Sequence, residues 1–554
     1  MMIDFLIANI APIMFFALVL FLLSGFPVAF ALAANGLIFG LIGIELGLMQ
    51  PSFLQALPSR VLSIMSNDTL LAIPFFTFMG LLLERSGMAE DLLDTIGQLF
   101  GPLRGGVAYA VIFVGALLAA TTGVVAASVI SMGLISLPIM LKYGYDKKVA
   151  SGVIAASGTL AQIIPPSLVL IIMADQLGRS VGDMYQAAFL PGLVLTLMYA
   201  GYIFLVSLIK PKWVPALPIE ARNLREENGN SGVVSLVLLS IASSLAGYAY
   251  ALYFKQGHPS VATDELIVYS VAIGIGFAFV LALINRWFKI GLLSRMAEKV
   301  VFVLVPPLAL IFLVLGTIFI GMATPTQGGG MGAFGAMILA MMNGRLNFKL
   351  AKQALDSTAR LSSFVMFILI GSTVFSLVFR GVNGDLWVEH LLTSLPGGQI
   401  GFLIAVNILF FVLAFFLDFF ELAFILVPLV GPVAEKLGIN LIWFGVLLGV
   451  NMQTSFMHPP FGFALFYLRS VAPKEVKTSD IYWGAIPFVL AQIIMVGLII
   501  AFPSLVSVDS KEHKKEELQL NISIPTDDGA VPSFDIPKDS EEQADIQASP
   551  SHAL

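Results

Sequence analysis

Two double prolines interrupt apolar stretches whose flanking residues are small and polar. Pro165-Pro166 closes the segment SGTLAQIIPPS, and Pro459-Pro460 lies in NMQTSFMHPPF. A proline inside a helix has no N–H to donate and clashes with the carbonyl four residues earlier. The sequence therefore predicts two broken helices with unpaired backbone carbonyls, at Ala161–Gln162 and at Ser455–Phe456.

Oxygen-bearing side chains stand beside both predicted breaks. They are Ser157 and Thr159 at the first break and Asn451, Gln453 and Thr454 at the second. Carbonyl and hydroxyl oxygens are hard ligands that suit Na⁺ better than any soft metal. Alternatively, each double proline only kinks a helix whose polar groups bond locally. Because the feature occurs twice, we favour Na⁺ binding at both places, next to Pro165 and Pro459.

Two acidic residues lie in an apolar stretch of the second half of the chain. Asp418 and Glu421 are three residues apart in LAFFLDFFELAFILVP and so share one helical face. A carboxylate at membrane depth is by default an ion or proton site, which makes Asp418 a candidate ion ligand. The other interpretation places both at the water interface, or pairs Glu421 with a base such as Arg380.

Two further polar segments are predicted to interrupt helices. Thr121 and Thr122 precede a glycine inside an apolar run, and ATPTQGGG separates two apolar runs. Glycines allow either close helix packing or close approach of the backbone to a substrate. The candidate substrate-pathway residues are Thr324, Thr326, Gln327 and Gly328. The alternative for this segment is a plain extracellular turn.

The composition is that of a membrane protein. Of 554 residues, 58% are hydrophobic, 12% are charged and none is cysteine, whereas soluble domains average about 25% charged residues. The sequence predicts a polytopic all-α membrane protein and excludes disulfides and thiolate metal sites. It contains no GxxxxGK[ST] and no HExxH motif, so we expect no enzyme and no cofactor besides a coupling ion. Residues 507–554, rich in acids, Pro and Ser, predict a disordered acidic tail.

The chain repeats itself at an offset of 294 residues, which carries Pro138, Gly144 and Pro165 onto Pro432, Gly438 and Pro459. This predicts two repeats, 1–209 and 300–506. An insert at 210–299 separates them, with basic loops and two extra spans at 233–254 and 266–287. Because the halves start on opposite sides of the membrane, they are predicted to be inverted repeats, the usual plan of secondary transporters.

Basic clusters predict the orientation. The positive-inside rule makes four of them cytoplasmic. They are Lys142, Lys147 and Lys148; Lys210, Lys212, Arg222 and Arg225; Arg286, Lys289, Arg295 and Lys299; and Arg345, Lys349, Lys352 and Arg360. The N-terminus is then outside, and inversion puts the C-terminus outside as well. The tail lysines, such as Lys511, argue for the opposite side, and we follow the repeat.

Several motifs in order resemble one transporter family. LLAIPFFTFMGLLLERSG, SLPIMLKYGY, GTLAQIIPPS, GMATPTQGGGMGAFGA and a late PPFG are similar to the large membrane subunit of the tripartite ATP-independent periplasmic (TRAP) transporters. The resemblance implies an elevator-type fold with helical hairpins and a multi-pass protein of the bacterial inner membrane. It also implies a Na⁺-driven importer of an organic carboxylate. Its partners would be a soluble periplasmic binding protein and a small four-helix membrane subunit, both on separate chains.

The resemblance also implies where Na⁺ binds. The first site falls on Thr121, Thr122, Leu160, Ile163 and Pro165, and the second on Asn451, Thr454 and Met457. Many members have Gly-Ser-Ser where this chain has Thr121-Thr122-Gly123, and the usual TPTE becomes TPTQ at Thr324–Gln327. The alternative function is a stand-alone ion- or proton-coupled carboxylate carrier or antiporter of a related inverted-repeat fold, with Asp418 as proton carrier.

Overall fold

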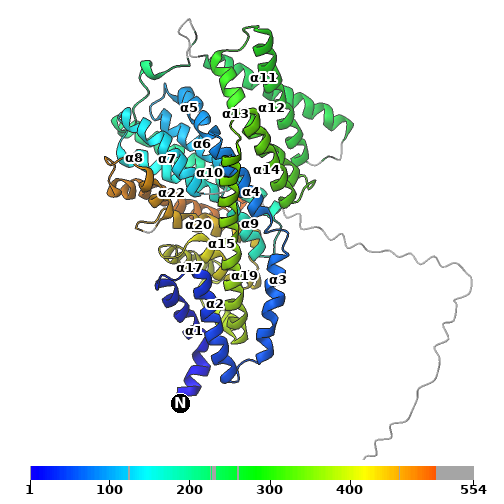
Figure 1. Ribbon diagram of the computed structural model, residues 1–554, viewed down its shortest axis with the longest axis vertical. Helices are drawn as coiled ribbons and strands as arrows, with labels where there is room; N and C mark the ends of the chain where they lie inside the picture. Colours follow the sequence, from blue (N-terminus) through cyan, green and yellow to red (C-terminus); the bar gives the residue numbers. More distant parts are fainter. Residues whose placement is uncertain are drawn as a thin grey trace, which may run out of the picture. The chain divides into compact units, whose positions relative to one another are not determined.

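The computed structural model describes residues 2–122, 125–224, 226, 232–258, 261, 263–460 and 462–506. All regular structure in these residues is helical (Figure 1). Nine of the described helices are long and apolar enough to cross a membrane, or ten if the bent pair α16–α17 is one span. The prediction of an all-α polytopic membrane protein is confirmed. The predicted tail at 507–554 lies outside the described residues.

The described residues of the first half form ten α-helices. They are α1 (Met2–Leu23), α2 (Val28–Glu45), α3 (Leu57–Met65), α4 (Ala72–Arg85), α5 (Met88–Phe100), α6 (Gly106–Thr122), α7 (Val125–Lys142), α8 (Lys147–Thr159), α9 (Leu168–Gln176) and α10 (Val181–Ile209). Two further helices, α11 (Val233–Gly257) and α12 (Thr263–Phe288), form the insert where two extra spans are predicted.

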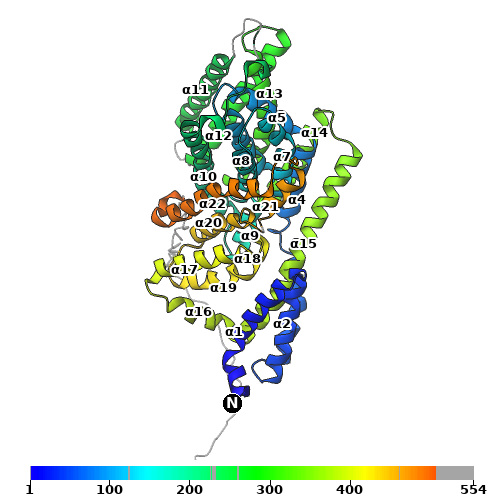
Figure 2. The same cartoon turned by 90° about the vertical axis from the view of Figure 1, so that its left-hand side faces the viewer.

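In the second half the part that the structure describes again forms ten α-helices. They are α13 (Arg295–Phe319), α14 (Pro325–Met342), α15 (Phe348–Gly381), α16 (Gly384–Thr393), α17 (Gly398–Leu413), α18 (Phe419–Ile425), α19 (Val427–Lys436), α20 (Leu441–Met452), α21 (Phe463–Val471) and α22 (Thr478–Ala501). In both views α1 and α2 lie near the end of α15, at the opposite end of the helical body from α11 and α12 (Figures 1 and 2).

Helix boundaries repeat at the offset read from the sequence. A shift of 294 residues carries α7 onto α18 and α19 together, from Phe419 to Lys436, and carries the start of α8 onto the start of α20. The capping residues correspond as well, because Asp146 caps α8 and its equivalent Asn440 caps α20 with side-chain oxygens. The two halves differ at α15, which runs unbroken for 34 residues where the first half has the separate helices α3 and α4.

Equivalent loops of the two halves lie at opposite ends of α10. Asp146 N donates to the carbonyl of Trp213, just beyond the last residue of α10. Arg179, just before the first residue of α10, pairs with Glu435 at 2.8 Å. The 29 residues of α10 span about 43 Å. The 142–146 loop and its equivalent at 436–440 are therefore separated by the length of a candidate membrane span, as inverted repeats require.

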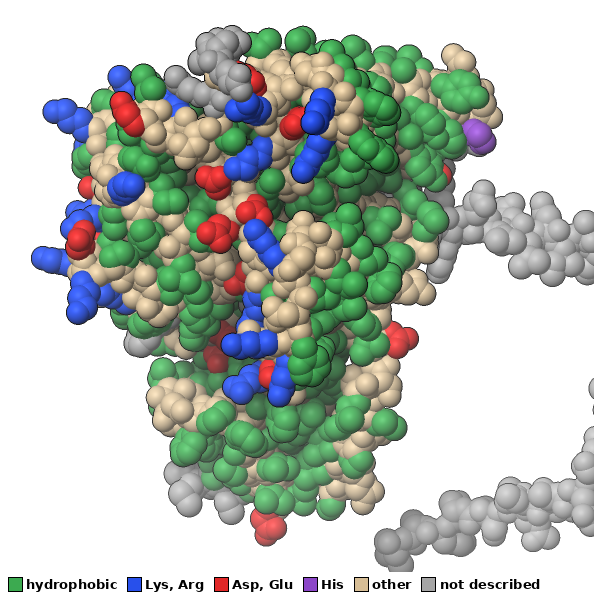
Figure 3. Space-filling model, turned by 45° about the horizontal axis from the view of Figure 1, so that its top comes forward, with side chains coloured by type: hydrophobic (Ala, Val, Ile, Leu, Met, Phe, Trp, Pro, Cys, Tyr) green, Lys and Arg blue, Asp and Glu red, His purple; other side chains and the backbone are tan. Residues whose placement is uncertain are grey.

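The four basic clusters are connected on one side of the helices, largely through α5. Gln98 of α5 donates to the carbonyl of Ala221, Asp94 pairs with Lys299, and Asp91 pairs with Arg345. The 142–148 loop joins them through the bond from Asp146 to Trp213 described above. Figure 3 shows Lys and Arg side chains numerous over the upper part of one face and sparse at its lower end. This common side agrees with the predicted cytoplasmic side.

The insert packs on the start of the second half. Helices α11 and α12 pack against each other and against α13, with Leu239, Ala282 and Val301 forming a small core of their own. Gly247 lets the two backbones approach closely, because a Cβ there would lie 2.4 Å from the Ser270 carbonyl oxygen. Small residues at the contact are typical of helix pairs in membranes.

Candidate ion-binding site

Both predicted helix breaks are present. Helix α8 tightens into the 3₁₀ turn η2 (Leu160–Gln162), and the chain resumes as α9 after Pro165-Pro166. In the second half α20 tightens into η5 (Gln453–Phe456), and the chain resumes as α21 after Pro459-Pro460. Both Pro-Pro peptide bonds are cis. At the first break Ser167 satisfies the carbonyl of Gln162 through its hydroxyl at 2.6 Å.

The two breaks meet inside the protein at equivalent residues. Gln453 Nε2 donates to Thr159 Oγ1 at 3.1 Å, and the two residues are 294 positions apart, the repeat offset itself. The helix contacts around the breaks cross between the halves in the same way. Helix α20, which precedes the second break, packs on α9, which follows the first. Helix α8, which precedes the first break, packs on α21, which follows the second. A twofold operation produces such exchanged contacts and brings equivalent positions on its axis together. The breaks therefore form one central site rather than two remote ones.

Buried oxygen atoms without a hydrogen-bond partner among the described residues surround this contact. They are Gln162 Oε1, Gln453 Oε1, Ser455 Oγ and Gln492 Oε1. Gln492 of α22 donates to the Tyr199 hydroxyl at 2.9 Å and contacts Met457 Sδ, which Thr159 also contacts. A buried polar oxygen that lacks a donor requires a water or an ion.

The predicted hydroxyl ligands are buried and oriented by the helix. Thr454 Oγ1 donates to the carbonyl of Asn451 at 2.6 Å, and Ser157 and Thr159 donate to Val153 and Ala156. A hydroxyl that has donated its only hydrogen retains acceptor lone pairs for a cation. Asn451 is itself fixed by two bonds from its amide to Asn407, at 2.8 and 2.9 Å.

The carbonyl oxygens predicted as backbone ligands differ in whether they already accept hydrogen bonds. The carbonyl of Leu160 already accepts from the amides of Ile163 and Ile164, so it is the weaker candidate. Ile163, Pro165 and Met457 are buried at the breaks, and Pro459 is half-buried. Thr121 and Thr122 close α6, but their side chains lie outside the described residues.

Asp418 has a local structural function. Its carboxylate accepts from Glu421 N at 2.9 Å, while the Glu421 carboxylate accepts from Asp418 N at 3.0 Å. This reciprocal pair is a capping box that satisfies the free amides at the first turn of α18. Among the described residues Glu421 makes no ion pair with Arg380.

The predicted substrate-pathway segment begins a helix. Thr324 and Gln327 form the capping box of α14, and Thr326 Oγ1 donates to the carbonyl of Asp68 at 2.5 Å. Gly328 packs on α13, where a Cβ would lie 2.8 Å from Ile318 Cδ1. The segment thus ties the start of α14 to the loop before α4.

Several polar residues at the centre were missed from the sequence. Gln162, Gln492, Tyr199 and Asn407 are all buried. A signal was present, because Gln492 and Asn407 each interrupt an otherwise apolar helix. His458, directly before the second double proline, stacks on Phe415 with ring centroids 4.1 Å apart.

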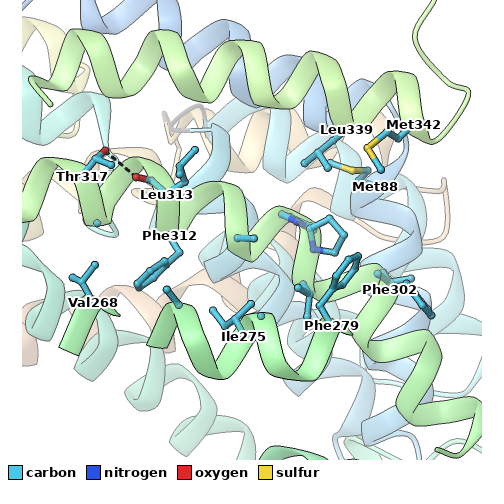
Figure 4. Close-up of a pocket in the computed structure, with 18 of the residues that line it drawn as sticks. Met88, Val268, Ile275, Phe279, Phe302, Phe312, Leu313, Thr317, Leu339 and Met342 are labelled. Carbon is cyan, nitrogen blue, oxygen red and sulfur yellow. Dashed lines mark hydrogen bonds between the residues drawn. The ribbon is translucent and has the colours of Figure 1, made fainter. Parts of the chain in front are cut away.

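Other features do not point to metal chemistry. No group of three or more His, Asp or Glu residues in the described part of the chain could hold a metal ion. A cavity of about 600 Å³ between α12, α13 and α14 is lined mainly by apolar side chains such as Phe279, Phe302 and Phe312 (Figure 4). Its lining includes no residue of either break.

Broken helices that meet at a buried polar centre are typical of secondary transporters. The chain belongs to the tripartite ATP-independent periplasmic transporter family, DctM component, whose model matches residues 15–505. It is therefore a TRAP transporter large permease and not an enzyme, as the sequence predicts.

Named relatives are similar over most of the chain. The C4-dicarboxylate TRAP transporter large permease protein DctM of Vibrio cholerae is 27% identical over 86% of this chain and 92% of its own length. The protein of the same name from Pseudomonas aeruginosa is 25% identical over 82% and 90%. The isethionate TRAP transporter permease protein DctMQ of Oleidesulfovibrio alaskensis is 22% identical over 89% of this chain and 65% of its own. Among solved structures, the Alcanivorax borkumensis YdaH transporter matches with a TM-score of 0.47 at 15% identity, over 83% of this chain and 91% of that one.

Proposed function

We propose that this chain is the permease subunit of a Na⁺-coupled secondary importer of an organic carboxylate in the bacterial inner membrane. It works with a soluble periplasmic binding protein that delivers the cargo and with a small four-helix membrane subunit. The observation that carries the proposal is the contact of Thr159 with Gln453 where the two broken helices meet, surrounded by buried oxygens without partners. The relatives named for C4-dicarboxylates support the substrate class.

Na⁺ couples to transport by completing the broken helices. Hydroxyl and carbonyl oxygens at Ser157, Thr159, Asn451 and Thr454 face two interrupted helix ends, and a cation lowers the cost of burying them. The occupied breaks are ordered, and the domain that contains them carries cargo and ion across the membrane as one body, in the manner of an elevator. Free energy from the Na⁺ gradient then replaces nucleotide hydrolysis.

Two experiments test the proposal with the intact permease. In the first, the melting temperature of the purified protein is measured in NaCl and in KCl at equal ionic strength, and we expect Na⁺ to stabilise it selectively. In the second, proteoliposomes with the small subunit are tested for uptake of labelled succinate, with and without the binding protein and a Na⁺ gradient. Equal melting in both salts contradicts the ion site, and uptake without binding protein supports a stand-alone carrier instead.

A further inference from the structure

A small polar cavity lies apart from the helix breaks. It has a volume of about 250 Å³ and lies between α3, the second half of α15 and the end of α9. Its polar lining residues are Arg60, Asn67, Asp175, Gln176, Ser372, Thr373, Ser376 and Arg380. A polar wall of this kind contrasts with the apolar lining of the larger cavity in Figure 4. Convergent polar groups in a cavity can fix the orientation of a bound ligand.

Two arginines against one carboxylate give the cavity a net positive charge. Arg60 and Arg380 make no ion pair and no side-chain hydrogen bond with any described residue. The one carboxylate in the wall, that of Asp175, accepts from two residues of the same wall, Asn67 at 2.7 Å and Gln176 at 2.9 Å. Two guanidinium groups on different helices are thus free to bind an anion.

The cavity lies at the end of the molecule opposite to the basic loops. Asp175 is four residues before Arg179, whose ion pair with Glu435 marks that end. The lining of the cavity includes Asn67. The carbonyl of the next residue, Asp68, accepts a hydrogen bond from Thr326 of the predicted substrate pathway. The nine residues of α9 place its far end about 13 Å from the first helix break. An anion in this cavity therefore lies between the outer surface and the ion-binding centre.

We propose that this cavity binds a carboxylate, with Arg60 and Arg380 pairing with the anion and Thr373 and Ser376 donating hydrogen bonds to it. A planar guanidinium pairs with a carboxylate through two parallel hydrogen bonds, which a lysine cannot provide. A phospholipid phosphate offers the same anionic chemistry. That the bound carboxylate is the transported cargo rests on the function proposed above, whereas anion binding itself does not.

The natural absence of cysteine allows a test that needs no knowledge of the cargo. In the full-length protein Ser376→Cys places one thiol in the cavity, and its reaction rates with anionic sulfonatoethyl and cationic trimethylammonioethyl methanethiosulfonate are compared. We expect the anionic reagent to react about tenfold faster, because a positive cavity concentrates anions. Adding Arg60→Gln and Arg380→Gln should bring the ratio to one or below, because the carboxylate of Asp175 then remains in the wall. Ser394→Cys, an exposed site at the end of α16, serves as the reference thiol, and Arg104→Gln as the matched exposed arginine.

Protection identifies the anion. Labelling of Ser376→Cys is repeated with succinate or sialate, and with liposomes with and without phosphatidylglycerol. Protection by a carboxylate that disappears with the two arginine changes supports the proposal. Protection by the anionic lipid alone assigns the cavity to a lipid phosphate and overturns the carboxylate assignment. Equal rates for both reagents, unaffected by the arginine changes, overturn anion binding altogether. Labelling requires neither Na⁺ nor binding protein, so these outcomes are separate from failure of the proposed transport function.

Discussion

Thr454 is the residue through which the ion site can be examined most directly. Its hydroxyl is fully buried and donates to the carbonyl of Asn451 at 2.6 Å. Thr454→Val keeps the volume but removes one candidate oxygen ligand. We expect the Na⁺ concentration for half-maximal uptake to rise about tenfold, which corresponds to the loss of roughly one hydrogen-bond equivalent.

Thr358 provides the matched control for this change. It is also buried and donates to the carbonyl four residues earlier, at 2.9 Å, but it lies in the middle of the unbroken α15. Thr358→Val should leave the Na⁺ dependence unchanged. A rise of the same size in both variants would mean that helix packing, and not ion ligation, was measured.

Substitutions of Asp418 distinguish a helix-capping carboxylate from a proton carrier. Asparagine caps helices as well as aspartate does, whereas alanine costs about 1 kcal/mol. Asp418→Asn should therefore keep stability and uptake, and Asp418→Ala should lower the free energy of unfolding with Na⁺ coupling retained. Proteoliposome uptake and thermal unfolding measure the two effects. Loss of ion coupling in Asp418→Asn would instead support the proton-coupled carrier.

The sequence predicted those single residues whose covalent geometry decides where a helix breaks. Proline chemistry located both breaks, and the residues beside them lie at the centre of the protein. The contact that joins the breaks was not predictable, because Thr159 and Gln453 are 294 positions apart and meet only when the helices that hold them are packed. The capping role of Asp418 was not predictable either, because the sequence does not show that Glu421 N is its partner.

Helices α8 and α22 depend on glycines that face each other. A Cβ on Gly152 would lie 2.1 Å from the Gly484 carbonyl oxygen, and one on Gly484 would lie 2.2 Å from the Lys148 carbonyl oxygen. Backbone atoms cannot rotate away as a side chain can. Gly152→Ala should therefore separate the helices and destabilise the protein by about 1–3 kcal/mol.

Gly201 shows what the same change does without a neighbour. It lies inside α10, and no atom of a neighbouring element lies within 4 Å of the position that a Cβ would take. Gly201→Ala should therefore be neutral or stabilise the protein by about 0.5–1 kcal/mol. Thermal unfolding of both variants in the same detergent makes the comparison. Equal stability for the two would show that α8 and α22 are not packed this closely.

The order of helices could be read from the sequence, but several boundaries could not. The two insert helices and the repeated breaks follow from hydrophobic runs and prolines. The first half is interrupted between α3 and α4, whereas their counterpart α15 is continuous; the interruption includes Asp68, whose carbonyl accepts from Thr326. No local pattern marks which copy of a repeat stays continuous.

For the whole molecule, inversion makes a topological prediction. Lys142 and Lys436 are equivalent and exposed, and their loops lie at opposite ends of α10. In inside-out and right-side-out vesicles, Lys142→Cys should react with an impermeant thiol reagent only from the cytoplasmic side and Lys436→Cys only from the outside. Labelling of both from one side would contradict inverted repeats. The sequence predicted this arrangement because charge and repetition are global features that survive without knowledge of packing.

The hydrogen bond between Thr159 and Gln453 joins two positions that the predicted repeat makes equivalent. Two identical halves related by a twofold axis would place identical side chains opposite each other there. Two halves in one chain are free of that requirement, and here a hydroxyl faces an amide. A substitution at either position then selects for a compatible change across the axis, so the two positions should evolve as a pair.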